Sequence, residues 1–91
     1  MADIQVSRTS DREYSVEVHD GTGSTRHVVE VGSTALERFG GGVDGETLLE
    51  ESFRFLLERE PKEAILRRFE ISVIGRYFPE YRAEIRRRLA D

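Results

Sequence analysis

The sequence contains no cysteine, no tryptophan and no asparagine, and it has a single lysine and two prolines. A chain without cysteine forms no disulfide and offers neither a thiolate nucleophile nor a cysteine ligand for a metal ion. Long apolar runs are also missing, since no stretch approaches the ~18 residues of a membrane-spanning helix. The first residues lack the basic and apolar segments of a secretion signal. We therefore expect a cytoplasmic protein with no membrane role, held together by hydrophobic packing.

The 91 residues suffice for one small domain, which we place at 1–91. The net charge is −4, but the two signs are unevenly distributed along the chain. Residues 1–60 contain 6 basic and 13 acidic side chains, whereas residues 61–91 contain 8 basic and 5 acidic ones. Such an asymmetry can mark an interaction face, although most charged side chains simply face solvent.

The first third of the chain alternates between apolar and polar residues, which is the period of half-buried strands. This pattern predicts a three-stranded antiparallel β-meander at about 3–8, 13–19 and 25–32. Placing Thr22 and Gly23 at the tip of the second hairpin pairs Tyr14 with Val31 and puts every alternating apolar side chain on one face. By the same parity, the first hairpin needs a loop of odd length, and a three-residue loop sets Val6 against Tyr14.

After the strands, the spacing of the apolar residues becomes helical. Asp44 is a suitable N-cap for an amphipathic main helix, and Thr34 has the capping-box spacing to Glu37. Pro61 and Pro79 each suit the first position of a further helix. We predict three to four helices packed on one sheet face, in an α+β fold: a short one at 35–39, the main helix at 45–59, and then 61–69, 73–78 and 79–90.

Two glycine-rich segments invite a phosphate-binding interpretation. DGTGST, at 20–25, resembles the phosphate hairpin of the actin and sugar-kinase ATPase superfamily, but that superfamily needs two large lobes and a second phosphate loop, which 91 residues cannot supply. GGGVDGET, at 40–47, fits the phosphate-loop spacing except that Glu46 replaces the lysine that neutralises the phosphates. We interpret the first segment as a hairpin tip and the second as a flexible connector.

No constellation of catalytic or metal-binding residues is recognisable. In the predicted register, His19 and His27 point to opposite faces of the sheet, so they do not share a metal ion. The nucleophile motif GxSxG is absent, and neither histidine stands in a triad pattern. We therefore predict no catalytic residue, no metal site and no cofactor, with an enzyme whose site is assembled only in three dimensions kept as an alternative.

The arginines of the C-terminal third are the remaining candidates for a site. Glu84 lies three and four residues before Arg87 and Arg88, which gives those two arginines intrahelical partners. Arg82 and Arg86, also one turn apart, have no such partner. Together with Arg67, Arg68 and Arg76, they are proposed to contact phosphate, an acidic partner or the acidic half of the same chain.

Taken together, these features predict a non-catalytic module that binds a protein partner or a second copy of itself. A homodimer is a hypothesis because either outer strand of the meander, 3–8 or 25–32, has an edge that another chain can pair with. A nucleic-acid-binding regulator that uses the arginine-rich C-terminal helices is the alternative, although such proteins usually carry a basic domain and this chain is acidic.

Overall fold

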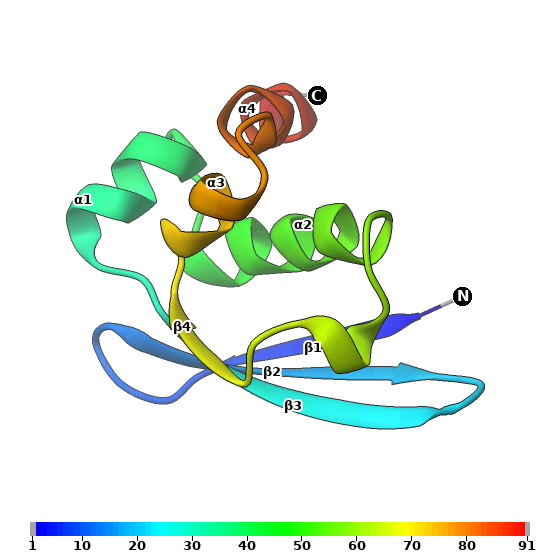
Figure 1. Ribbon diagram of the computed structural model, residues 1–91. Coiled ribbons are helices and arrows are strands. Elements are labelled where there is room, and N and C mark those ends of the chain that lie inside the picture. Colours follow the sequence, from blue (N-terminus) through cyan, green and yellow to red (C-terminus); the bar gives the residue numbers. More distant parts are fainter. Residues whose placement is uncertain (1, 91) are drawn as a thin grey trace.

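The computed structural model describes residues 2–90 and confirms an α+β fold, shown in Figure 1. Strands β1 (Asp3–Arg8), β2 (Glu13–Asp20) and β3 (Gly23–Glu30) form the predicted antiparallel meander. A fourth strand, β4 (Arg68–Glu70), pairs parallel with β3 and gives the sheet order β1-β2-β3-β4. The helical elements are α1 (Ser33–Ala35), the π-helix η1 (Leu36–Gly40), α2 (Gly45–Leu57), the 3-10 turn η2 (Lys62–Ala64), α3 (Val73–Tyr77) and α4 (Tyr81–Ala90).

The helices lie on one face of the sheet, and α2 forms the middle layer between the sheet and α4 (Figure 1). The alternation in β2 and β3 explains this arrangement, because it turns Tyr14, Val16, Val18 and Val29 toward α2. On its other side, α2 buries Phe55 completely. The apolar surface of this amphipathic helix is thus wide enough to contact both the sheet and α4.

The hairpin register differs from the prediction by two residues. Asp20 pairs with Gly23, so the tip is Gly21 and Thr22, and Tyr14 pairs with Val29 rather than Val31. Asp20 fixes this tip because its Oδ1 accepts hydrogen bonds from the Thr22 amide, at 2.8 Å, and from the Thr22 hydroxyl, at 2.7 Å. A shift of two residues keeps every side chain on its predicted face.

The first hairpin shows the same kind of difference. Its last pair is Arg8 with Tyr14, so Val6 pairs with Val16 and five residues separate the paired ends. The loop is odd in length, as predicted, but longer than three residues. The Thr9 and Ser10 amides both bond to the Glu13 carbonyl and close the loop.

The prediction of a helix at 61–69 is wrong. Only η2 is helical there, and the chain then extends into β4. Phe69 and Ile71 are buried whereas Arg68 is exposed, which is the alternation of a strand. The backbone bonds from the Val28 amide to the Arg67 carbonyl, 2.8 Å, and from the Ile71 amide to the Glu30 carbonyl, 3.0 Å, cover the edge of β3. The predicted edge at 25–32 is therefore not an edge, and the outer strands are β1 and β4.

The other helices match the prediction apart from their ends. Asp44 caps α2 as predicted, accepting a 2.8 Å hydrogen bond from the Thr47 amide. Thr34 does not cap the short helix, because α1 begins at Ser33, two residues before the predicted start, and its N-cap is Gly32. Phe78 leaves helical geometry before Pro79, as a residue preceding proline tends to do, and α4 begins at Tyr81 rather than 79.

Candidate functional site: an apolar groove beside β4

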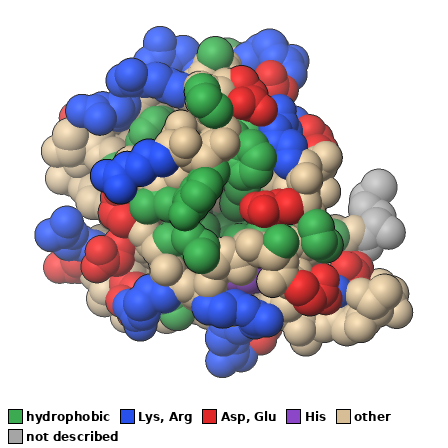
Figure 2. All heavy atoms as spheres, viewed as in Figure 1, with side chains coloured by type: hydrophobic (Ala, Val, Ile, Leu, Met, Phe, Trp, Pro, Cys, Tyr) green, Lys and Arg blue, Asp and Glu red, His purple; other side chains and the backbone are tan. Residues whose placement is uncertain are grey.

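A mainly apolar hollow lies between the C-terminal part of α2, the η2–β4 segment and α3, and we call it the β4 groove. Its volume is about 440 Å³. Figure 2 shows it as a patch of apolar side chains in the middle of the visible face, with charged side chains around it. The groove is lined by Leu56, Glu60, Ala64, Ile65, Leu66, Phe69, Val73, Ile74, Tyr77 and Phe78.

Two side chains of the β4 groove are unusually exposed for their size. Leu66 is 47% exposed and Tyr77 is 67% exposed, and they are the large apolar residues that the described part of the chain leaves in solvent. A single exposed leucine is common on protein surfaces, but here two such side chains border one apolar hollow. Residues 2–90 thus leave open an apolar surface that is continuous with the core.

The segment carrying Leu66 is anchored at one end by a buried lysine. Lys62 is 1% exposed, and its Nζ donates hydrogen bonds to Asp20 Oδ1 at 2.8 Å and to Thr22 Oγ1 at 2.7 Å. Its third partner is Glu63, at 2.7 Å. The Asp20 bond raises the pKa of Lys62 and holds the pKa of Asp20 well below its usual range. We call these four residues the hairpin clamp, because they join the β2–β3 tip to η2.

His27 anchors the same segment from inside the core. Its Nδ1 lies 2.8 Å from the Leu66 carbonyl, which only accepts, so Nδ1 carries the proton and Nε2 accepts from the Thr25 hydroxyl at 2.8 Å. The ring is fully buried beside Phe53 and its burial lowers the pKa of His27. Because it pairs across from Val16 and faces the core, His27 lies on the opposite side of the sheet from His19, as predicted.

Glu60 is the one carboxylate among the residues that line the groove. Burial raises its pKa, and no basic side chain among residues 2–90 forms an ion pair with it. The adjacent Arg59 does not pair with Glu60, because its guanidinium binds Glu80 at 2.9 Å. A carboxylate in this environment attracts a cation, because partial burial weakens its hydration and nothing within the described chain offsets its charge.

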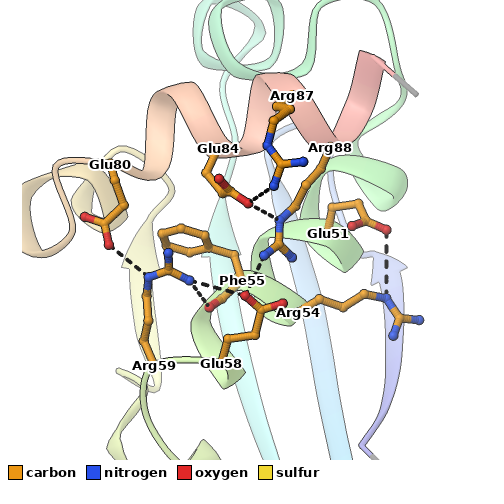
Figure 3. A network of polar contacts seen from close by, with 9 residues as sticks. All are labelled: Glu51, Arg54, Phe55, Glu58, Arg59, Glu80, Glu84, Arg87 and Arg88. Carbon is orange, nitrogen blue, oxygen red and sulfur yellow. Dashed lines mark hydrogen bonds and ion pairs between the residues drawn. The ribbon is translucent and has the colours of Figure 1, made fainter.

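Several arginines instead form ion pairs where α2 and the residues after it pack against α4, and their side chains point toward glutamates (Figure 3). Arg88 binds Glu58 at 2.6 Å and Glu84 at 3.2 Å. The Arg59 guanidinium lies 3.6 Å from the centre of the Phe55 ring and covers it. Glu84 also binds Arg87, as its sequence spacing predicts. These contacts fasten α4 to α2.

The five arginines proposed from the sequence are all exposed, but they do not form one face. Arg67 and Arg76 adjoin Leu66 and Tyr77 of the β4 groove in the chain, and neither makes an ion pair with residues 2–90. Arg68 binds Glu13 of β2 at 3.0 Å, so it contacts the acidic half of its own chain.

The remaining two proposed arginines lie on α4. Arg86 lines a second, smaller hollow of about 330 Å³ together with Arg38 of η1, and we call it the α4 cleft. Arg82 is one turn away from Arg86. Within the described residues, none of these three arginines has an ion-pair partner.

The groove is hard to predict from the sequence. Leu66 falls in the helix predicted at 61–69, and Tyr77 falls in the helix predicted at 73–78. One signal was available: Phe69 and Ile71 alternate with Arg68 and Glu70, which predicts a strand. With that strand assigned, Leu66 falls in a loop.

Within residues 2–90, no group of three His, Asp or Glu side chains is arranged to hold a metal ion. No buried polar side-chain atom in this range lacks a hydrogen-bond partner. The helices described here are also too short or too polar to cross a membrane. A comparison of the chain with known protein families, curated proteins and solved structures finds no match, so the functional argument rests on the geometry of the chain itself.

Proposed function

We propose that the protein is an interaction module that binds an apolar segment of a partner protein in the β4 groove. The single observation that carries this proposal is the hollow bordered by exposed Leu66 and Tyr77. Nine of the ten lining side chains are apolar, and a hollow of about 440 Å³ lies in the size range of ligand sites. With Glu60 as the one charged group in the lining, the groove suits side chains of a polypeptide better than a polar metabolite, which needs several convergent polar groups.

The test is a selection from a library of short random peptides displayed on phage, with the protein as bait. We expect enriched peptides that carry apolar residues and that no longer bind Tyr77→Ser or Leu66→Ser. Both residues are exposed, so these variants should keep the thermal unfolding midpoint of the wild type. Arg82→Ser, on α4, is the matched control and should bind normally. Enriched peptides that bind all four proteins equally would refute the proposal.

A second candidate function is nucleic-acid binding, favoured by Arg38 and Arg86, which line the α4 cleft, and by Arg82, one turn from Arg86. None of the three has an ion-pair partner within residues 2–90. Phosphate contacts by such arginines weaken steeply as salt rises. Duplex DNA and RNA, each added to labelled protein at low salt, should then shift the NMR signals of these three residues and lose the effect at higher salt. Unchanged spectra at low salt would exclude this candidate.

A further inference from the structure

The outer edge of β4 is open for pairing with another chain. The residues of β4 alternate in direction, and Arg67, Phe69 and Ile71 turn their backbone groups to β3. The amide and carbonyl groups of Arg68 and Glu70 consequently point away from the sheet. An edge strand with such groups is a template for an added strand.

The β4 groove lies directly beside this edge, on the helix side of the sheet. Phe69 of β4 is one of its lining residues, whereas the side chain of Arg68 crosses the opposite face to reach Glu13. Side chains of a strand alternate between faces. A strand added to β4 therefore presents every second side chain to the groove.

The other edge of the sheet lacks this combination. β1 is longer, but none of its residues, Asp3–Arg8, lines the β4 groove. An added strand there gains backbone hydrogen bonds without an adjoining apolar hollow. Affinity in strand addition comes from the backbone bonds and specificity from pockets for alternate side chains, and only β4 offers both.

The charges of the groove indicate what else the added strand carries. Glu60 sits in the lining without a cation from residues 2–90. A lysine or arginine on the incoming segment supplies the missing charge, and its aliphatic stem also fits an apolar wall.

Resting on the proposed function, we infer that the partner segment binds in extended form as a fifth strand on the edge of β4. It inserts apolar side chains two residues apart into the β4 groove and places a lysine or arginine beside Glu60. The ligand class is thus an extended apolar peptide with one basic residue beside Glu60.

Strand addition is tested with a peptide selected as above and synthesised with single N-methyl groups along its backbone. Methylation at alternate positions that bond to β4 should weaken binding about tenfold or more, since each lost amide donor also leaves a carbonyl unpaired. Methylation at the intervening positions should have little effect. In the complex, the amides of Arg68 and Glu70 should become protected from hydrogen exchange.

The charge assignment is tested by Glu60→Lys, used as bait in the same selection. Peptides enriched on this variant should carry aspartate or glutamate where the wild type selects lysine or arginine. Glu46→Lys makes the same charge change at an exposed site in the first turn of α2 and should leave the selected residues unchanged.

The outcomes of these experiments distinguish failure of strand addition from failure of the proposed interaction module. If peptides need Tyr77 but tolerate methylation everywhere, or leave Arg68 and Glu70 unprotected, strand addition is wrong and the interaction module stands. If no selected peptide depends on the groove, both fail. If the protein alone forms dimers by light scattering, with these two amides already protected, the occupant is a second copy and the peptide assignment is overturned.

Discussion

Lys62 is a single residue that positions η2 and, through it, Leu66. It is the only lysine of the chain, and the hairpin clamp joins two segments forty residues apart in the sequence. Its ammonium group is buried against three oxygen-bearing side chains, so its charge is compensated in the folded state and exposed to water in the unfolded one. The position of η2, and through it of Leu66, depends on this contact.

Lys62→Met keeps most of the aliphatic stem but removes the charge and all three hydrogen bonds. We expect it to lower the midpoint of thermal unfolding by roughly 5 °C or more, because the Asp20 carboxylate loses its partner. Differential scanning calorimetry measures this change. Arg67→Met, at an exposed position of the same segment, is the control and should melt with the wild type. Equal midpoints for Lys62→Met and the wild type would show that the clamp contributes nothing.

His27 makes stability depend on pH. Burial lowers its pKa in the folded protein, while the unfolded chain binds the proton near the ordinary value of 6.5. The unfolded state therefore holds more protons below about pH 6.5, and the free energy of unfolding must fall as the pH drops through this window. Above it, this group has no effect on the pH dependence.

Urea unfolding between pH 8 and about pH 5 measures this dependence, which one histidine limits to about 1.4 kcal/mol per pH unit. His27→Gln keeps a donor and an acceptor, and its curve should be flatter than that of the wild type. His19→Gln removes the partly exposed histidine of the opposite sheet face and is the matched control. A wild-type slope retained by His27→Gln would mean that other groups titrate.

At the scale of elements, α2 begins where the sequence indicates. Asp44 is exposed, and hydrogen bonding from the Thr47 side chain and from the Thr47 amide lowers the pKa of Asp44. Asp44→Ala should lower the free energy of unfolding by about 1 kcal/mol, as the loss of a helix cap does. Asp44→Asn retains a capping oxygen and should be close to the wild type. Urea unfolding of the three proteins distinguishes them, and equal losses in both variants would implicate charge instead.

Local features of the helices and strands could be predicted from the sequence, whereas the pairing of the strands could not. The cap of α2 and the faces of β2 and β3 are local properties, so Asp44 and Val16 could be assigned correctly. The hairpin register was wrong by two because the face test cannot detect an even shift. β4 was missed because the alternation around Phe69 spans only a few residues, and its conformation also depends on pairing with β3, a contact distant in the chain.

For the whole molecule, the uneven charge has a partly internal explanation. The acidic residues 1–60 and the basic residues 61–91 meet in the fold, since Arg68 binds Glu13 and Arg88 binds Glu58. The arginine pattern alone could not reveal this pairing, because it depends on which elements lie side by side. Among the charges of residues 2–90 that lie outside such pairs are Glu60 in the groove and the arginines Arg67, Arg76, Arg82 and Arg86.

The burial of Lys62 also gives the protein a built-in chemical reporter. A protonated amine with three oxygen partners and almost no exposed surface does not react with acylating reagents, so the Lys62 ε-amine becomes reactive only when the hairpin clamp opens. With no other lysine side chain in the sequence, acylation at this residue, read by peptide mass spectrometry, times the opening of the wall that carries Leu66. A ligand bound in the β4 groove should therefore lower the rate of acylation at Lys62, and this measurement requires no added label on the protein.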